Sequence, residues 1–195
     1  MMTVQIVVFA CWIVFLLYWP ISAQSVKSIQ KTRGPLGGNW YPIVILIGAL
    51  FIGDFRFLAR FGIPVHALAV LLIPHIIVIN VVVVLLLVAG LVVAIIARRT
   101  LAGNWSAAVA LKKDHELITT GLYQYVRHPI YTGMLLMVLG TALLLGTLGA
   151  CIGFFIILLG VWLKLKEEEA LLMETFTEEY SSYKNHTKIL IPFLW

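Results

Sequence analysis

Long apolar runs separated by polar segments dominate the chain. The runs cover about residues 3–23, 40–60, 63–97 and 130–163. A helix needs roughly 20 residues to cross about 30 Å of hydrocarbon, so each of the first three runs is long enough for one crossing. The last run is interrupted at residues 146–149 by Gly-Thr-Leu-Gly, which predicts a tight turn between two short helical arms. The pattern therefore predicts an all-α integral membrane protein with about five transmembrane helices.

Two of these runs carry a further prediction. No basic segment precedes the run at 3–23, and it is long enough to span, so we expect a retained helix rather than a removed signal peptide. The run at 63–97 is too long for one untilted crossing, and Pro74 lies inside it. Because proline removes a helical hydrogen bond and clashes with the preceding turn, we expect a kink at Pro74.

Composition and charge placement support a membrane protein and predict its orientation. Hydrophobic residues make up 62 % of the chain and charged residues 12 %, against about 45–50 % and roughly 25 % in soluble domains. With five spans, 12 of the 14 Lys and Arg residues lie on one side, in loops 24–39 and 98–130 and in the C-terminal tail. The other side holds only Arg56 and Arg60. The positive-inside rule then places the C-terminus in the cytoplasm and the N-terminus outside. Cations scattered in this way do not indicate a nucleic-acid partner.

The C-terminal segment has a different pattern. Residues 164–183 carry apolar side chains at intervals of three or four, as an amphipathic helix requires. These side chains are Leu165, Leu172, Phe176, Tyr180 and Tyr183. Residues 189–195 are apolar but too few to span, so we expect them to dock on the rest of the protein.

Two polar blocks hold the residues that could carry chemistry. The first, residues 115–133, contains Arg-His-Pro at 127–129 directly before an apolar helix, and the second, residues 164–183, contains three consecutive glutamates. Taken singly, each has a plain explanation. The Arg-His-Pro triplet suits positive charge at the membrane surface, followed by proline in the first turn of a helix. The glutamates suit a solvated helix face, and Tyr180 and Tyr183 suit interfacial packing.

Several common sites are missing from the sequence. It has no Gly-x-Gly-x-x-Gly, no Walker loop, no His-Glu-x-x-His and no cysteine pair at metal-ligand spacing. Cys11 and Cys151 both lie in apolar runs, and we interpret them as structural. We therefore expect neither a metal site nor a soluble-type dinucleotide-binding domain.

Together, in this order and around a helical hairpin, the two blocks resemble the isoprenylcysteine carboxyl methyltransferase family of membrane enzymes. The first block matches the family's His-x-Leu…Gly-x-Tyr…Arg-His-Pro-x-Tyr-x-Gly at His115, Leu117, Gly121, Tyr123, Arg127, His128, Pro129, Tyr131 and Gly133. The second matches Glu-Glu-x-x-Leu-x-x-x-Phe-Gly-x-x-Tyr-x-x-Tyr and a late proline at Glu168, Glu169, Leu172, Phe176, Tyr180, Tyr183 and Pro192. The resemblance covers about residues 104–195, and the length and layout resemble a short prokaryotic or archaeal member.

Two departures from the family pattern concern single residues. Thr177 replaces the usual glycine after Phe176, which we expect to be tolerated. Lys164 stands where the family usually has arginine before the glutamate pair. Lysine cannot form the bidentate contact with a carboxylate that arginine forms, so such a contact is not expected here.

The resemblance implies a methyl donor and an acceptor. The donor would be S-adenosylmethionine, which leaves as S-adenosylhomocysteine, and the acceptor the carboxylate of a prenylated cysteine or a similar lipid-like molecule. Residues 1–100 would then form three N-terminal transmembrane helices. Residues 101–195 would form the catalytic region, with a cytoplasmic cofactor-binding segment, the hairpin and the C-terminal helix.

The residue types suit this chemistry. A carboxylate with a pKa near about 3.5 is nucleophilic at neutral pH and needs no general base, so the enzyme must align it with the methyl group at about 3–3.5 Å and exclude water. Arg127 or Lys164 is expected to hold the carboxylate. We expect the amino-acid end of the cofactor to bind His115 and the backbone near Leu117 and Gly121. Adenosine is expected to lie against Tyr123, His128, Pro129 and Tyr131. The ribose hydroxyls or the ammonium are expected to bind Glu168 and Glu169.

Three other functions compete with this interpretation. A phospholipid or amine N-methyltransferase would need a base to take a proton from its acceptor. An NADPH-dependent sterol-type reductase has a C-terminal block that resembles Arg-His-x-x-Tyr-x-Gly, but Pro129 and the Glu168-Glu169 pair favour a methyltransferase. A small transporter or assembly factor is disfavoured because transporters place polar residues near the membrane midplane, whereas here they gather at one face.

Overall fold

The computed structural model describes residues 2–24, 26–32, 41–53, 60–62, 65–74 and 76–192; Arg56, used above in the charge count, lies outside them. Most of these residues are helical. The elements in chain order are α1 (Met2–Ala23), β1 (Ile29–Thr32), α2 (Tyr41–Ile52), α3 (Val65–Leu68), α4 (Ile77–Leu101), η2 (Ala102–Asn104), β2 (Ala110–Lys112), η3 (Gly121–Gln124), α5 (Pro129–Leu145), α6 (Leu148–Thr175) and α7 (Thr177–His186).

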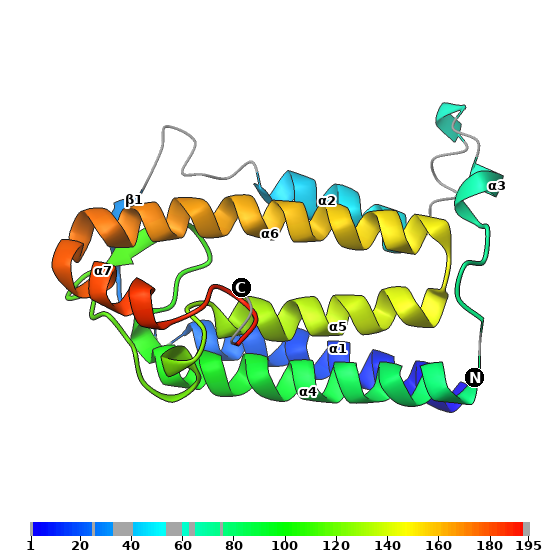
Figure 1. Cartoon of the computed structure of the whole chain (residues 1–195), viewed down its shortest axis with the longest axis horizontal. Coiled ribbons are helices and arrows are strands. Elements are labelled where there is room, and N and C mark those ends of the chain that lie inside the picture. The colour runs from blue at the N-terminus through cyan, green and yellow to red at the C-terminus, as the bar shows by residue number, and fades with distance from the viewer. Residues whose placement is uncertain are drawn as a thin grey trace.

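The long helices run side by side along the molecule (Figure 1). Helix α4 packs against α5 and α1, and α2 packs against α6. Glycines bring two of these pairs into backbone contact. A Cβ atom added at Gly90 of α4 would lie 2.5 Å from the Gly133 carbonyl oxygen of α5, and one added at Gly48 of α2 would lie 2.8 Å from the Gly153 carbonyl oxygen of α6. Such close approach of small residues is how helices pack in a membrane, where no hydrophobic effect drives them together.

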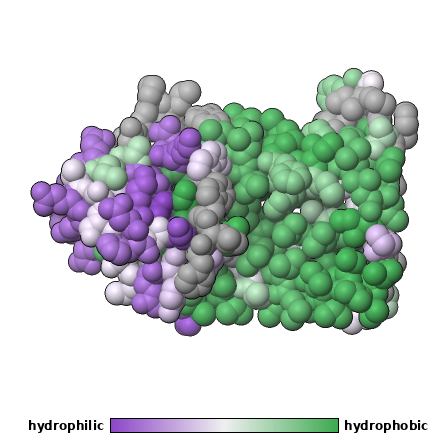
Figure 2. Space-filling view, viewed as in Figure 1, coloured by the Kyte–Doolittle hydropathy of each residue, from purple (hydrophilic) through white to green (hydrophobic). Residues whose placement is uncertain are grey.

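In the described part of the chain, three helices are long and apolar enough to cross a membrane: Met2–Ala23, Ile77–Asn104 and Leu148–Thr175. Helices α2 and α5 are apolar but shorter. The surface divides accordingly into a broad hydrophobic band over the helices and a polar end beside α7 and β1 (Figure 2). Large apolar side chains face outward along the band, among them Phe9 and Leu17 of α1 and Ile77 and Leu85 of α4. This distribution is that of an integral membrane protein.

The predicted hairpin between α5 and α6 is confirmed, whereas the predicted kink at Pro74 is wrong. Gly146 ends α5 in the left-handed region at φ 64°, and the Thr147 side chain caps α6 by accepting a hydrogen bond from the Ala150 N–H. Helix α4 begins only at Ile77, after Pro74. The chain before the proline is instead held at the hairpin, where the N–H groups of Leu72 and Ile73 both donate to the Gly146 carbonyl.

The C-terminal segment also departs from the prediction. Helix α6 continues without a break from the membrane run to Thr175, so no separate amphipathic helix begins at residue 164. Good helix formers at 164–172 explain the continuation. The break falls at Phe176, and α7 follows. The predicted docking of the tail is confirmed for its described part, since residues 188–190 bond to the segment before α5 and to α5 itself.

A short ladder at the polar end was not predicted. Strand β1 pairs antiparallel with β2, so that Ile29 lies opposite Lys112 and Lys31 opposite Leu111. Neither segment alternates clearly between apolar and polar residues, and therefore no strand signal was available. The ladder holds the loop after α1 against the segment that follows α4.

Candidate active site

A cavity opens at the polar end, between the segment that joins α4 to α5 and the ends of α6 and α7. Its walls come from residues 101–131 and from Glu168, Leu171, Leu172, Tyr180 and Tyr183. Of the residues predicted to bind cofactor or acceptor, seven line it: His115, Leu117, Tyr123, Arg127, His128, Tyr131 and Glu168. The structure thus brings together two polar blocks that are separated in sequence by the hairpin.

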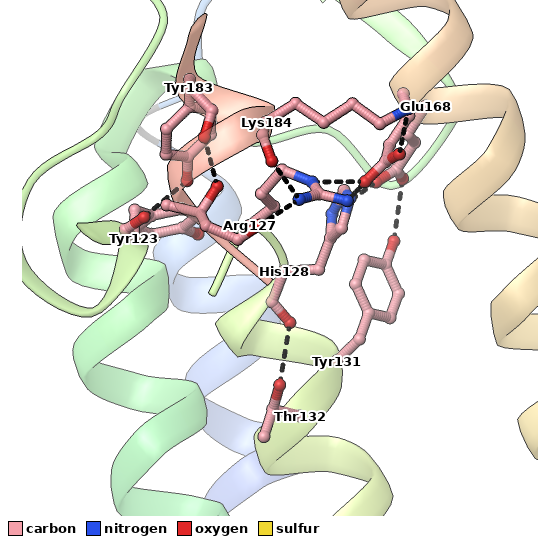
Figure 3. Close-up of polar contacts among 10 residues, drawn as sticks. Tyr123, Arg127, His128, Tyr131, Thr132, Glu168, Tyr183 and Lys184 are labelled. Atoms are coloured by element: carbon pink, nitrogen blue, oxygen red, sulfur yellow. Dashed lines mark hydrogen bonds and ion pairs between the residues drawn. The ribbon is translucent and has the colours of Figure 1, made fainter. Parts of the chain in front are cut away.

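Two adjacent glutamates on α6 face the N-terminus of α5 (Figure 3). The Tyr131 hydroxyl donates to Glu168 Oε1 at 2.9 Å, and Arg127 Nε donates to Glu169 Oε1 at 2.7 Å. The His128 ring lies between them, with Nε2 at 3.3 Å from Glu169 Oε1 and Nδ1 at 3.7 Å from Glu168 Oε2. The Arg-His-Pro-x-Tyr sequence therefore positions both carboxylates from the start of α5 and the two residues before it.

Arg127 is occupied within the protein. Besides Glu169, its guanidinium donates from Nη1 to the carbonyl oxygens of Thr187 at 2.6 Å and Lys184 at 3.4 Å. Its backbone N–H donates to the Lys188 carbonyl at 2.8 Å. The side chain is only 5 % exposed. Arg127 thus ties the C-terminal tail and α6 to the start of α5.

Lys164, one helical turn before Glu168, is surrounded by aromatic rings. Its Nζ lies 4.8 Å from the Tyr41 ring centroid and 5.2 Å from that of Tyr131. It donates to the Ala107 carbonyl at 2.7 Å and lies 3.5 Å from Glu168 Oε1. Lys164 does not itself line the cavity, but its ammonium is held beside a glutamate that does. Cation–π contacts of this kind stabilise a desolvated ammonium.

His115 lines the opposite wall of the cavity, in the loop between β2 and η3. Its ring lies 6.0 Å from that of Phe176. Burial, with the nearby positive charges of Lys27 and Lys112, lowers the pKa of His115 below its ordinary value, so the imidazole is neutral at physiological pH. Its Nδ1 atom is buried and has no hydrogen-bond partner in the described part of the chain. A buried ring nitrogen without a partner is a place where a bound polar molecule would complete a hydrogen bond.

The remaining predicted residues surround these groups. Pro129 is the first residue of α5, where its missing N–H costs nothing, and Gly121 takes φ 63° at the start of η3. Tyr123 is buried, and its carbonyl accepts from the Tyr183 hydroxyl at 2.6 Å. Burial raises the pKa of both tyrosine hydroxyls, Tyr123 and Tyr183. Gly121, Pro129, Lys164 and Glu169 lie next to the cavity rather than in its wall.

Sequence reasoning missed three contributors. Tyr41, at the start of α2, reaches Lys164 from a part of the chain that was predicted only to span. The Asn104 side chain joins two loops, because its Oδ1 accepts from Lys27 Nζ at 3.3 Å and from the Glu116 N–H at 3.4 Å. Trp105 also lines the cavity. Tyr41 and Trp105 are aromatic residues at the edges of apolar runs, and this position was the available sign of a role in the site. The same position indicates a membrane interface as readily as a site.

Comparison with known proteins relates the chain to one family of enzymes. The model of the isoprenylcysteine carboxyl methyltransferase (ICMT) family matches residues 76–174, about half of the chain. A Saccharomyces cerevisiae protein named protein-S-isoprenylcysteine O-methyltransferase is 38 % identical over 102 residues, which cover 51 % of this chain and 43 % of the relative. Proteins of that name from Schizosaccharomyces pombe and Rattus norvegicus are 37 % identical over 94 residues and 33 % over 107. These matches cover 47 % and 51 % of this chain, and 40 % and 36 % of the two relatives. The matched segment thus spans less than half the length of these relatives.

Proposed function

The chain belongs to the isoprenylcysteine carboxyl methyltransferase family, and we propose that it transfers a methyl group from S-adenosylmethionine to the carboxylate of a prenylated cysteine or a similar lipid-like acceptor. The single observation that carries the proposal is the convergence of His115, His128, Tyr131 and Glu168 on one cavity at the polar end of a membrane helix bundle. A polar cofactor can reach such a cavity from water, and a greasy acceptor can reach it from the membrane.

The donor set of the cavity suits the cofactor. His115 Nδ1 is a buried atom that lacks a partner among the described residues, and with the backbone of Leu117 it would hold the amino-acid end of the cofactor. The Tyr123, His128 and Tyr131 rings would enclose adenosine, with Pro129 and Gly121 shaping the backbone around it. Glu168, which has one oxygen bonded to Tyr131, would accept from ribose hydroxyls or the ammonium. When bound, S-adenosylmethionine supplies an electrophilic methyl group on a positively charged sulfur.

The acceptor needs orientation rather than activation, because its carboxylate is already ionised at neutral pH. We assign this task to Lys164, whose ammonium lies between two rings beside Glu168. Arg127 is the less suitable of the two candidates, since its guanidinium is bonded to Glu169 and the tail carbonyls. We assign Arg127 and Glu169 to holding α5, α6 and the tail in place, which keeps water out of the cavity.

Topology and domain division form part of the same proposal. Five spans would include the short helices α2 and α5 with the three long ones. Because most of the lysines and arginines lie at the polar end, that end would face the cytoplasm. The catalytic region would be residues 101–195, supported by a cavity lined wholly by residues 101–183.

Calorimetric titration of the detergent-purified protein with S-adenosylhomocysteine tests the proposal. We expect saturable binding that is lost in His128→Ala and retained in His186→Ala, a matched control at an exposed histidine of α7. Methyl transfer to a prenylated cysteine derivative then tests the acceptor. Binding of NADPH in place of S-adenosylhomocysteine would overturn the proposal in favour of a reductase, and binding of neither ligand would argue against both enzymes.

A further inference from the structure

A second cleft lies at the polar end, next to the cavity described above, with which it shares Trp105, Ser106 and Ala108. It runs between the end of α1, strand β1 and the segment 105–108, and its polar lining residues are Lys27, Ser28, Ser106 and Lys112. We propose that this cleft binds a phosphate group, held by the Lys112 ammonium with support from Lys27 and the two serine hydroxyls. The proposal is independent of the methyl-transfer reaction.

Lys112 is a cation that the described residues leave without a counter-charge. It lies on β2, opposite Ile29 of β1, and is 6 % exposed. Within the described ranges it makes no hydrogen bond and no ion pair. Burial lowers the pKa of Lys112, and no neighbouring carboxylate contributes a compensating rise. The side chain lines the cleft, where a bound anion would supply the missing counter-charge.

Two other buried cations near the interface differ from Lys112 because each has at least one partner within the described residues. Lys164 lies beside Glu168. Arg98 donates to the carbonyl oxygens of Ala102 and Ser22 and lies 4.7 Å from the Trp105 ring centroid. Lys112 has no such partner within the described residues, so its three N–H donors are available to a ligand.

Lys27 adds a second positive charge to the same cleft. Its Nζ donates to Asn104 Oδ1 at 3.3 Å and to the Asp114 carbonyl at 2.7 Å, which fixes its position and leaves one N–H for a ligand. Two ammonium groups and two hydroxyls suit a phosphate group, which carries several strong acceptor oxygens.

The source of the phosphate is either a phospholipid headgroup or a soluble molecule. The cleft lies at the end of α1, a candidate membrane span. Trp105, which lines the cleft, packs edge-on against Trp19 of α1 at 6.0 Å, and tryptophan marks the level of lipid headgroups. These features favour a phospholipid headgroup. Inorganic phosphate carries the same chemical group without the acyl chains and therefore serves as the comparison ligand.

Calorimetry of the full chain in detergent separates these sources. The probes are dihexanoyl phosphatidic acid, dihexanoyl phosphatidylcholine and inorganic phosphate. We expect saturable binding of phosphatidic acid, weakened by about tenfold or more in Lys112→Gln, as expected for loss of a charged hydrogen bond, and restored at least partly in Lys112→Arg. The matched control is Lys113→Gln at the exposed neighbour, which should bind as the unmodified chain does.

A second variant keeps the test decisive if Lys112→Gln does not fold. Ser28 is exposed, so Ser28→Asp should leave the fold intact. The new carboxylate should form an ion pair with the Lys112 ammonium and so prevent phosphate binding. Equal binding of inorganic phosphate and phosphatidic acid would assign the site to a soluble phosphate. Lack of saturable binding by every probe, equal weakening by Lys113→Gln, or full binding by Ser28→Asp would overturn the proposal.

Discussion

Arg127 Nε donates a hydrogen bond to Glu169 Oε1 at 2.7 Å, across 42 positions of sequence and between side chains that are both largely buried. The same guanidinium donates to the carbonyl oxygens of Thr187 and Lys184. One residue therefore connects the start of α5, the end of α6 and the C-terminal tail. The cavity wall depends on that connection, since His128 is the next residue and Glu168 precedes Glu169.

Removal of this buried pair should destabilise the protein. We expect Arg127→Ala to lower the free energy of unfolding by about 3–5 kcal/mol, because it leaves Glu169 buried without its main partner. Thermal unfolding in detergent measures the effect. The control is Lys31→Ala, which removes an exposed pair between Lys31 and Glu174, with side chains 50 % and 55 % exposed, and should cost at most about 1 kcal/mol. Equal losses in the two variants would contradict the assigned role of Arg127.

Lys164 should affect the acceptor more than the cofactor. We expect Lys164→Met to lower kcat/KM for the acceptor by about tenfold or more, because a charged hydrogen bond is lost, while affinity for S-adenosylhomocysteine changes little. Lys164→Arg should retain much of the activity. Steady-state rates over a range of acceptor concentrations measure this. Lys166→Met is the control, since Lys166 is exposed and contacts the Trp162 ring instead. Unchanged kinetics in Lys164→Met would exclude the residue as the carboxylate anchor.

The neutral His115 ring predicts a pH dependence. Since folding lowers the pKa of His115, its protonation is easier in the unfolded chain. Its contribution to stability is therefore complete above the ordinary pKa of about 6.5 and decreases as the pH falls below that value. We expect affinity for S-adenosylhomocysteine to fall at still lower pH, where the folded-state imidazole takes a proton beside Lys27 and Lys112.

Titrations between about pH 5 and 8 measure this dependence around the ordinary histidine pKa. In His115→Gln the acid-side decrease in affinity should disappear, whereas the exposed-site variant His186→Gln should keep it. A decrease that persists unchanged in His115→Gln would assign the titration to another group.

The contact between α4 and α5 should tolerate no side chain at Gly90. A Cβ atom there would lie 2.5 Å from the Gly133 carbonyl oxygen, which is backbone and cannot rotate away. We expect Gly90→Ala to lower the free energy of unfolding by about 1–3 kcal/mol. Ala89→Leu, at the exposed neighbouring position, is the control and should be close to neutral. Comparison of the two unfolding midpoints decides the point, and a neutral Gly90→Ala would show that the helices can separate at this contact.

Several features of the site could be found from sequence because they depend on local order. Arg127, His128 and Tyr131 lie within five positions at the start of a helix, and Glu168 and Glu169 are adjacent on another. Residues this close in sequence around the start of a helix lie near one another whatever the rest of the fold is. Tyr41 and Lys112 could not be assigned in this way, because each acquires its role from a segment more than 60 positions away.

The apolar runs by themselves determined that the protein is helical and lies in a membrane, because crossing hydrocarbon requires long apolar segments with their backbone bonds satisfied internally. They also determined the hairpin, through the Gly-Thr-Leu-Gly interruption. Tertiary structure decided where α4 begins, since the chain before Pro74 bonds to the Gly146 carbonyl rather than extending a helix. It decided too that Arg127 bonds to Glu169 and the tail, while Lys112 has no partner among the described residues. Charge pairing depends on distances between segments remote in sequence, and only packing sets those distances.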